Sequence, residues 1–156
     1  MQIEKIAVQD VQQLLNLILA LAEEESFPYP VTVTSQDLIN NLLAEESHAS
    51  AFFIKVDNQL AGFAVVYKTF ATTTGKNGLH LDDFYILPEF RGKGLGEKFI
   101  RYLAINATKS DFARIEWLCV ASNKNAISFY QSLGAKSLEE LKFFRLDSEA
   151  INNLNN

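Results

Sequence analysis

The stretch YILPEFRGKGLGEKFIRYLA, residues Tyr85 to Ala104, carries three glycines at alternate positions directly after an apolar and aromatic run. The residues before Pro88 have the composition of a strand, whereas Phe99, Ile100 and Leu103 return to the spacing of one helical face. The glycines therefore lie where a strand leads into a helix. A junction of this kind is where a chain can hold an anion.

The glycine stretch has the features of a phosphate site. Gly92, Gly94 and Gly96 lack a Cβ, so the backbone can approach a ligand closely, and the first amides of the helix have no partner within it. Arg91 and Lys93 add positive charge beside the helix start. The alternative is a turn that only reverses the chain. The spacing excludes the loop of the nucleoside triphosphatases, which needs Gly-Lys-Ser/Thr, and the dinucleotide fingerprint.

Composition predicts one soluble domain over residues 1–156. The chain has 48% hydrophobic and 21% charged residues and a formal net charge of −5. This charge argues against nucleic acid as a partner and is compatible with a cationic small substrate, although mild acidity also serves solubility alone. One cysteine cannot form an internal disulfide, and no apolar run is long enough for a bilayer. The charged opening residues have no apolar leader, so we expect a cytoplasmic protein without a membrane partner.

The pattern of apolar residues predicts a mixed α/β fold with a mixed central sheet flanked by helices on both faces, because a strand-helix-strand unit prefers a parallel, right-handed crossover. Pro28 and Pro30 should end the first helix, and residues 152–156 should fray. The expected elements are a helix at Val8–Glu25, a helix beginning at Thr34, a hairpin in residues 51–70 turning at Asp57-Asn58, a strand at Leu79–Leu87, a helix at Gly96–Thr108, a strand at Arg114–Val120, a helix at Asn125–Leu133 and a strand at Leu141–Leu146.

Two motifs resemble the GNAT acyltransferases. RGKGLG, Arg91 to Gly96, matches their pyrophosphate loop Arg/Gln-x-x-Gly-x-Gly/Ala, and NKNAISFYQSLGA, Asn123 to Ala135, matches their later Asn-x-x-Ala-x-x-Phe-Tyr…Leu-Gly segment. LAEEESFPYPVTVTSQDL and LHLDDFYILPEFRGKGLG further resemble the diamine (spermidine/spermine) and thialysine N-acetyltransferases. The resemblance runs from about Gln2 to Leu146. It implies the GNAT fold and a homodimer.

The resemblance also implies an activity, which is transfer of the acetyl group of acetyl-CoA to a primary amine of a small molecule in a ternary complex. The amine would be a diamine, a polyamine or a thialysine-like amino acid. Pyrophosphate would lie on the glycine loop, pantetheine would run beside the preceding strand, and amides near Ile86 would polarise the thioester carbonyl. The implied cofactor-binding residues are Phe84, Tyr85, Ile86, Arg91, Gly92, Lys93, Gly94, Leu95, Gly96, Asn123, Asn125 and Tyr130.

Two residues are implied as catalytic, Asp82 and Tyr130. An amine with a lysine-like pKa of about 10.4 is almost entirely protonated at neutral pH, so a group must take its proton. Asp82 and Asp83 precede the glycine loop on the strand, and strand alternation predicts that only one of them points into the cleft. By resemblance Asp82 takes the proton, through water, and Tyr130 protonates the departing thiolate. The alternatives are two solvated acids and a core tyrosine.

The implied amine site consists of Glu24, Glu25, Asp82 and Asp83, and here the chain departs from its relatives. The alternative for the glutamates is a solvated helix end. A long polyamine is less favoured than a shorter amine, because charges or rings that would hold it are missing. Glu24 replaces a tyrosine, Tyr29 and Pro30 replace two acids, Ser122 replaces an aromatic residue and Leu141 replaces a tryptophan.

Other chemistry is disfavoured. Cys119 suits a buried strand position better than an acyl-enzyme route, and His48 and His80 with one cysteine form no metal-ligand spacing. Asn123 and Asn125 either donate to the cofactor or cap the following helix. Two other functions remain open, a transferase acting on a protein or peptide amine and a module that binds acyl-CoA without turnover.

Overall fold

The computed structural model describes residues 1–27 and 29–155. These residues divide into two compact units, Met1–Asn123 and Lys124–Asn156. The single domain expected over residues 1–156 stays a prediction. Pro28, expected to help end the first helix, and Asn156, in the expected frayed end, lie outside the described residues.

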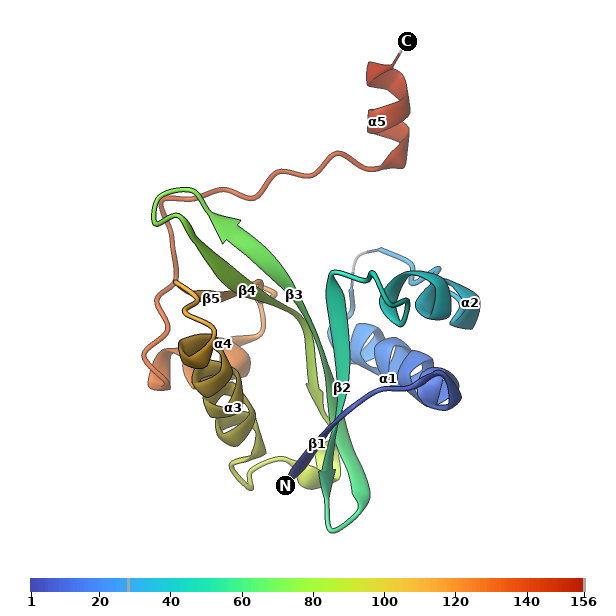
Figure 1. The fold of residues 1–156 in the computed structure, drawn as a ribbon, viewed down its shortest axis with the longest axis vertical. Coiled ribbons are helices and arrows are strands. Elements are labelled where there is room, and N and C mark those ends of the chain that lie inside the picture. The colour runs from blue at the N-terminus through green and yellow to red at the C-terminus, as the bar shows by residue number, and fades with distance from the viewer. Residues whose placement is uncertain (28, 156) are drawn as a thin grey trace. The chain divides into compact units, whose positions relative to one another are not determined.

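In the first unit the described residues form a five-stranded sheet in the order β1-β2-β3-β4-β5 (Figure 1). The strands are β1 Gln2–Lys5, β2 Ala49–Val56, β3 Gln59–Ala71, β4 Lys76–Ile86 and β5 Ile115–Trp117. The first four pair antiparallel and β5 runs parallel to β4, so the predicted mixed sheet is confirmed. Asp57 and Asn58 form the predicted hairpin turn, both with positive φ, 50° and 63°.

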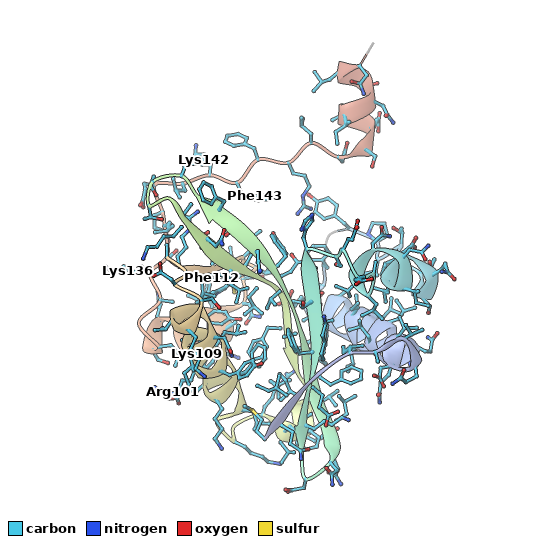
Figure 2. The ribbon with its side chains drawn as sticks, viewed as in Figure 1. Arg101, Lys109, Phe112, Lys136, Lys142 and Phe143 are labelled. Atoms are coloured by element: carbon cyan, nitrogen blue, oxygen red, sulfur yellow. The ribbon has the colours of Figure 1, made fainter. Side chains whose placement is uncertain are left out.

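Helices cover both faces of this sheet, as predicted. Helix α1 (Val11–Glu24), preceded by the 3₁₀ turn Val8–Asp10, and the short helix α2 (Ser35–Asp37), continued by a π-helical turn at Leu38–Leu42, lie on one side, and α3 (Leu95–Lys109) lies on the other (Figure 1). The α1 face buries Leu14, Leu38, Phe53, Phe63 and Val65, and the α3 face buries Ile54, Val66, Leu81, Phe99 and Leu103. Arg101 points away from the sheet on the outer side of α3 (Figure 2).

Thr34 starts α2 as predicted. Its hydroxyl accepts a hydrogen bond from the Asp37 amide, and the Asp37 carboxylate accepts one from the Thr34 amide at 2.9 Å. This reciprocal pair is a capping box.

The sequence missed β1 and overestimated other strands. QIEK has one apolar residue suited to a sheet face, and only its pairing with β2, Ile3 opposite Ile54, makes it a strand. The expected strand at Arg114–Val120 is reduced to the three residues of β5. The expected strand at Leu141–Leu146 is wrong, because an apolar-rich segment cannot form a strand without a ladder partner, and the described residues supply none there.

The second unit contains α4 (Lys124–Ser132), which confirms the predicted helix, and α5 (Ser148–Leu154). Residues 152–154 of the expected frayed end are therefore helical. Between the two helices the side chains of the predicted strand are exposed, 67% for Phe143 and 85% for Phe144 (Figure 2). No helix among the described residues is long and apolar enough to cross a membrane.

Candidate active site

The glycine loop connects the end of β4 to α3. After a 3₁₀ turn at Pro88–Phe90, Gly92 and Gly94 take positive φ, 70° and 71°, and Gly94 is the residue before the first turn of α3. A Cβ at either glycine would meet nothing within 4 Å, so the backbone conformation, not space, requires glycine there. No side chain caps α3 within the described residues. Its first amides are therefore available to an anion.

The end of β4 is open on the side of β5. The two strands pair only at Leu79–Leu81, and no other described strand pairs with Asp82–Ile86 on that side. The Leu87 amide donates a hydrogen bond to the Ala61 carbonyl, on the side of β4 that faces β3. Because the backbone groups of successive strand residues point to opposite sides, those of Ile86 point to the open side. The Ile86 carbonyl there accepts a hydrogen bond from Arg91 Nε at 2.8 Å.

A β-bulge interrupts the alternation of β4 at Asp82. The register passes from Val65 opposite Asp83 to Val66 opposite Leu81, so Asp82 is the extra residue. Alternation therefore does not determine how Asp82 and Asp83 face relative to each other, and the expectation that only one of them points into the cleft stays a prediction. Asp83 shares the α1 face with Val65, and His80, three residues earlier, shares it with its partner Tyr67, on which it stacks at 4.7 Å between ring centroids.

The bulge places a carboxyl with altered acidity on the α1 face. Burial, then the charge of Asp82, then that of Glu25 raise the pKa of Asp83 from 3.8 to about 6. Burial and then the Asp82 charge likewise raise the pKa of Tyr67. Asp83 therefore changes its protonation close to neutral pH, which suits a proton acceptor.

The end of α1 contacts both β4 and the glycine loop through Glu24. Arg91 Nη2 donates to Glu24 Oε2 at 2.7 Å, and the Tyr85 hydroxyl donates to the same oxygen at 3.2 Å. The Arg91 guanidinium also lies over the Tyr85 ring, with Cζ 5.4 Å from the centroid. The hydrogen bond from Arg91 is the main cause that lowers the pKa of Glu24. The Glu24 charge is thus compensated by Arg91.

An open cavity of about 310 Å³ lies between the end of α1 and the segment after β5. Its lining residues are Glu24, Glu25, Ser26, Val120, Ser122 and Asn123. Two carboxylates among mainly polar neighbours favour a cation in this cavity. The participation of Ser26 and Val120 was not predicted, because neither residue type carries a chemical signal and only the fold brings the two segments together.

The predicted residues of the first unit gather around the end of β4. Glu24, Tyr85 and Arg91 are in direct contact, and Glu25 acts electrostatically on both Asp83 and Cys119. Burial and then Glu25 raise the pKa of the Cys119 thiol, which disfavours the thiolate that an acyl-cysteine route would need. Among residues 1–27 and 29–155, no three His, Cys, Asp or Glu side chains are arranged to hold a metal ion.

Two predicted site residues belong to the second unit. Asn125 and Tyr130 lie on α4, where Tyr130 packs on Phe129 with 5.2 Å between ring centroids. The Tyr130 carbonyl accepts hydrogen bonds from the Leu133 and Ala135 amides, which close the helix end. The roles of Asn125 and Tyr130 at the site stay predictions.

Comparisons with known proteins agree on one family. The sequence model of the Acetyltransferase (GNAT) family matches residues 14–135. A thialysine N-epsilon-acetyltransferase of Caenorhabditis elegans is 30% identical over 154 residues, 97% of this chain and 94% of the relative. A human spermidine/spermine N(1)-acetyltransferase-like protein 1 is 28% identical over 96% of this chain and 23% of its own length. An integron cassette protein from the mobile metagenome of Vibrio cholerae shares the fold, with a TM-score of 0.76, 24% identity and coverage of 99% of this chain and 96% of the other.

Proposed function

Because the chain belongs to the GNAT acetyltransferase family and is an acyltransferase, we propose that it transfers the acetyl group of acetyl-CoA to a primary amine of a small molecule. The observation that carries this proposal is the meeting of an uncapped helix start, an open strand end and an acidic cavity around Glu24. The first two suit a phosphorylated thioester and the third suits a cationic acceptor.

The cofactor side of the proposal rests on backbone groups. The amides at the start of α3 and the side chains of Arg91 and Lys93 would hold pyrophosphate, which needs several donors at once. The Ile86 amide, on the side of β4 that has no strand partner among the described residues, would donate to the thioester oxygen as negative charge develops there. Asn123 and, by resemblance, Asn125 would hold the pantetheine chain. Acetyl-CoA supplies an activated acyl group for this chemistry.

The amine side uses the carboxylates of the first unit. Glu25, Asp82 and Asp83 would attract the ammonium group, and Asp82, through water, would take its proton; the raised pKa of Asp83 would make it a second proton acceptor. The neutral nitrogen then forms a bond to the acetyl carbon while the carbon–sulfur bond breaks. Tyr130 would give its proton to the leaving thiolate. The second proton, which the nitrogen loses as the amide forms, would return to Tyr130 once the tyrosine has protonated the thiolate, so that both protons that leave the ammonium group have an acceptor.

The size and charge of the cavity support a short amine as the acceptor. A volume of about 310 Å³ lies at the small end of ligand pockets, and its acids sit at one end of α1. The relatives named for thialysine and for spermidine/spermine accord with a diamine, a polyamine or a thialysine-like amino acid. We propose the shorter of these, because Tyr29, Pro30 and Ser122 supply no second anionic site.

A direct assay tests the proposal. Free-thiol release from acetyl-CoA would be followed with diamines, spermidine, thialysine, lysine and peptides with free N-termini. We expect turnover with one class of small amine, and a loss of at least about 10²-fold in Asp82→Asn or Tyr130→Phe, the usual contribution of general acid–base catalysis. Turnover with peptides alone would support a protein acetyltransferase instead. CoA binding without thiol release from any amine would leave a binding module.

By resemblance we also propose a homodimer in the cytoplasm, which sedimentation and fractionation would test.

A further inference from the structure

Glu24 belongs to two parts of the proposed site at once. Glu24 lines the acidic cavity at the end of α1, and its carboxylate accepts the hydrogen bond from Arg91 of the glycine loop. Glu24 and Arg91 thus form an ion pair between segments that lie 67 positions apart in the chain. The pair connects the surface proposed for phosphate with the surface proposed for the amine.

The Glu24–Arg91 pair conflicts with phosphate binding. A carboxylate 2.7 Å from the guanidinium compensates the charge that Arg91 would present to a phosphate, and its own charge repels the phosphate. The pyrophosphate of the cofactor can compete with Glu24, because its two phosphoryl groups together carry two negative charges and accept bidentate hydrogen bonds from a guanidinium, whereas the carboxylate carries one charge. The two side chains are 42% and 45% exposed, so water can replace either partner during an exchange.

An exchange of Glu24 for phosphate by Arg91 would change the charge of the cavity. While Glu24 is paired, the cavity presents the charge of Glu25 with that of Glu24 compensated. Once Arg91 has turned to a phosphate, the Glu24 carboxylate is uncompensated and faces the cavity that it already lines. The Tyr85 hydroxyl, which donates to the same oxygen, keeps Glu24 at this position without cancelling its charge.

We infer that Arg91 exchanges Glu24 for a cofactor phosphate, and that the released Glu24 carboxylate then strengthens binding of the cationic amine. This inference rests on the proposed function. It makes the two substrates bind with positive coupling. Glu24 acts here as a positioning residue for charge, not as a catalytic group.

The expected coupling is modest. An exposed ion pair has a free energy of at most about 1 kcal/mol, which converts to a factor of about five in affinity. CoA should therefore raise the affinity for a diamine about fivefold, and by reciprocity the diamine should raise the affinity for CoA by the same factor. Removing the Glu24 charge should remove this factor and strengthen CoA binding on its own, because Arg91 no longer has a carboxylate to leave.

Calorimetric titration tests the inference with two probes that cannot react with each other, CoA and 1,4-diaminobutane. In the unaltered chain we expect about fivefold tighter diamine binding when CoA is saturating. In Glu24→Gln we expect about threefold to fivefold tighter CoA binding and no coupling. The matched control is Glu25→Gln, which removes a neighbouring acid of the same cavity that has no bond to Arg91. It should weaken diamine binding equally with and without CoA and leave CoA affinity unchanged.

A double-mutant cycle separates exchange from simple repulsion. If Arg91 must leave Glu24, the gain in CoA affinity from Glu24→Gln disappears in an Arg91→Gln background; a gain that persists there reflects repulsion alone and overturns the inference. Unchanged or weaker CoA binding in Glu24→Gln also overturns it, since Glu24 would then only orient Arg91. Thermal unfolding of each variant confirms that it is folded. The CoA titrations require no turnover, so failure of the exchange and failure of the proposed amine transfer give different results.

Discussion

Replacing Asp83 with asparagine should make the fold more stable while it impairs the enzyme. Folding raises the pKa of this carboxyl from 3.8 to about 6. The folded state therefore holds the proton more tightly than the unfolded state, so the contribution of Asp83 to stability is fully present below pH 3.8 and is lost as the pH rises through about 6. Above that pH the ionised side chain opposes folding.

The size of the effect follows from the shift. A pKa difference of about two units corresponds to about 3 kcal/mol of unfolding free energy at pH 7.5. The Asp83→Asn variant would lose the charge but keep a half-buried amide that needs hydrogen-bond partners, so we expect roughly half of this gain, about 1.5 kcal/mol. At pH 4.5 almost all of Asp83 is protonated in the folded state and its ionisation opposes folding by only about 1 kcal/mol, so the cost of the amide should cancel the gain.

Urea unfolding followed by the fluorescence of Trp117, the only tryptophan, measures both quantities. Asp57→Asn is the matched control, because Asp57 is exposed in a hairpin turn with a φ of 50° that asparagine tolerates, and it should change stability by less than about 0.5 kcal/mol at either pH. Equal or lower stability of Asp83→Asn at pH 7.5 would refute the argument. A gain of the same size at pH 4.5 would also refute it, since the cause would then not be ionisation.

Three further predictions address the strand, the loop and the proton acceptor. The kcat/KM for the amine should fall as the pH falls through about 6, and Glu25→Gln should move this limb to lower pH, because the Glu25 charge helps to raise the pKa of Asp83; an unmoved limb would exclude Asp83 as its origin. Gly62→Ala should unfold the chain or lower its unfolding free energy by more than about 3 kcal/mol in urea titrations, because the Cβ of the alanine would lie 2.1 Å from the Tyr85 carbonyl oxygen. A decrease of less than about 1 kcal/mol would contradict this contact. Gly94→Ala should cost about 1 kcal/mol of stability and also weaken CoA binding. The control Gly75→Ala, with a φ of 66° in a distant turn, should cost the same stability and leave CoA binding unchanged. Equal CoA affinities of the two variants would argue against the loop as the phosphate site.

The sequence predicted much of the candidate site because its chemistry is local. The strand, the alternating glycines and α3 follow one another without interruption, so the helix start with its free amides could be predicted from residues 85–104 alone. The acids at the end of α1 were visible for the same reason. Their relation to the loop was not visible, because the hydrogen bond between Glu24 and Arg91 spans 67 positions.

The strand wrongly predicted at residues 141–146 and the strand β1 that the sequence missed have a common cause. QIEK became β1 through pairing with β2, whereas residues 141–146, although rich in apolar residues, did not become a strand. In both cases the ladder partner decided the outcome, and the pattern within the segment did not. Strand pairing is a contact between distant residues, whereas helix periodicity is contained in one segment, which explains why α1, α3 and α4 were predicted within a few residues.

The amino-acid sequence by itself determined the order of the helices and central strands, the glycine-rich start of α3 and the acidic end of α1, since each depends on residues close together in the chain. Only the tertiary structure decided the pKa values of the carboxyl groups at the candidate site. The bulge at Asp82 places Asp83 on the α1 face near Glu25, and the packing of α1 against β4 brings Glu24 to Arg91. The pKa of a carboxyl depends on burial and on charges a few ångströms away, and only the folded chain sets those distances.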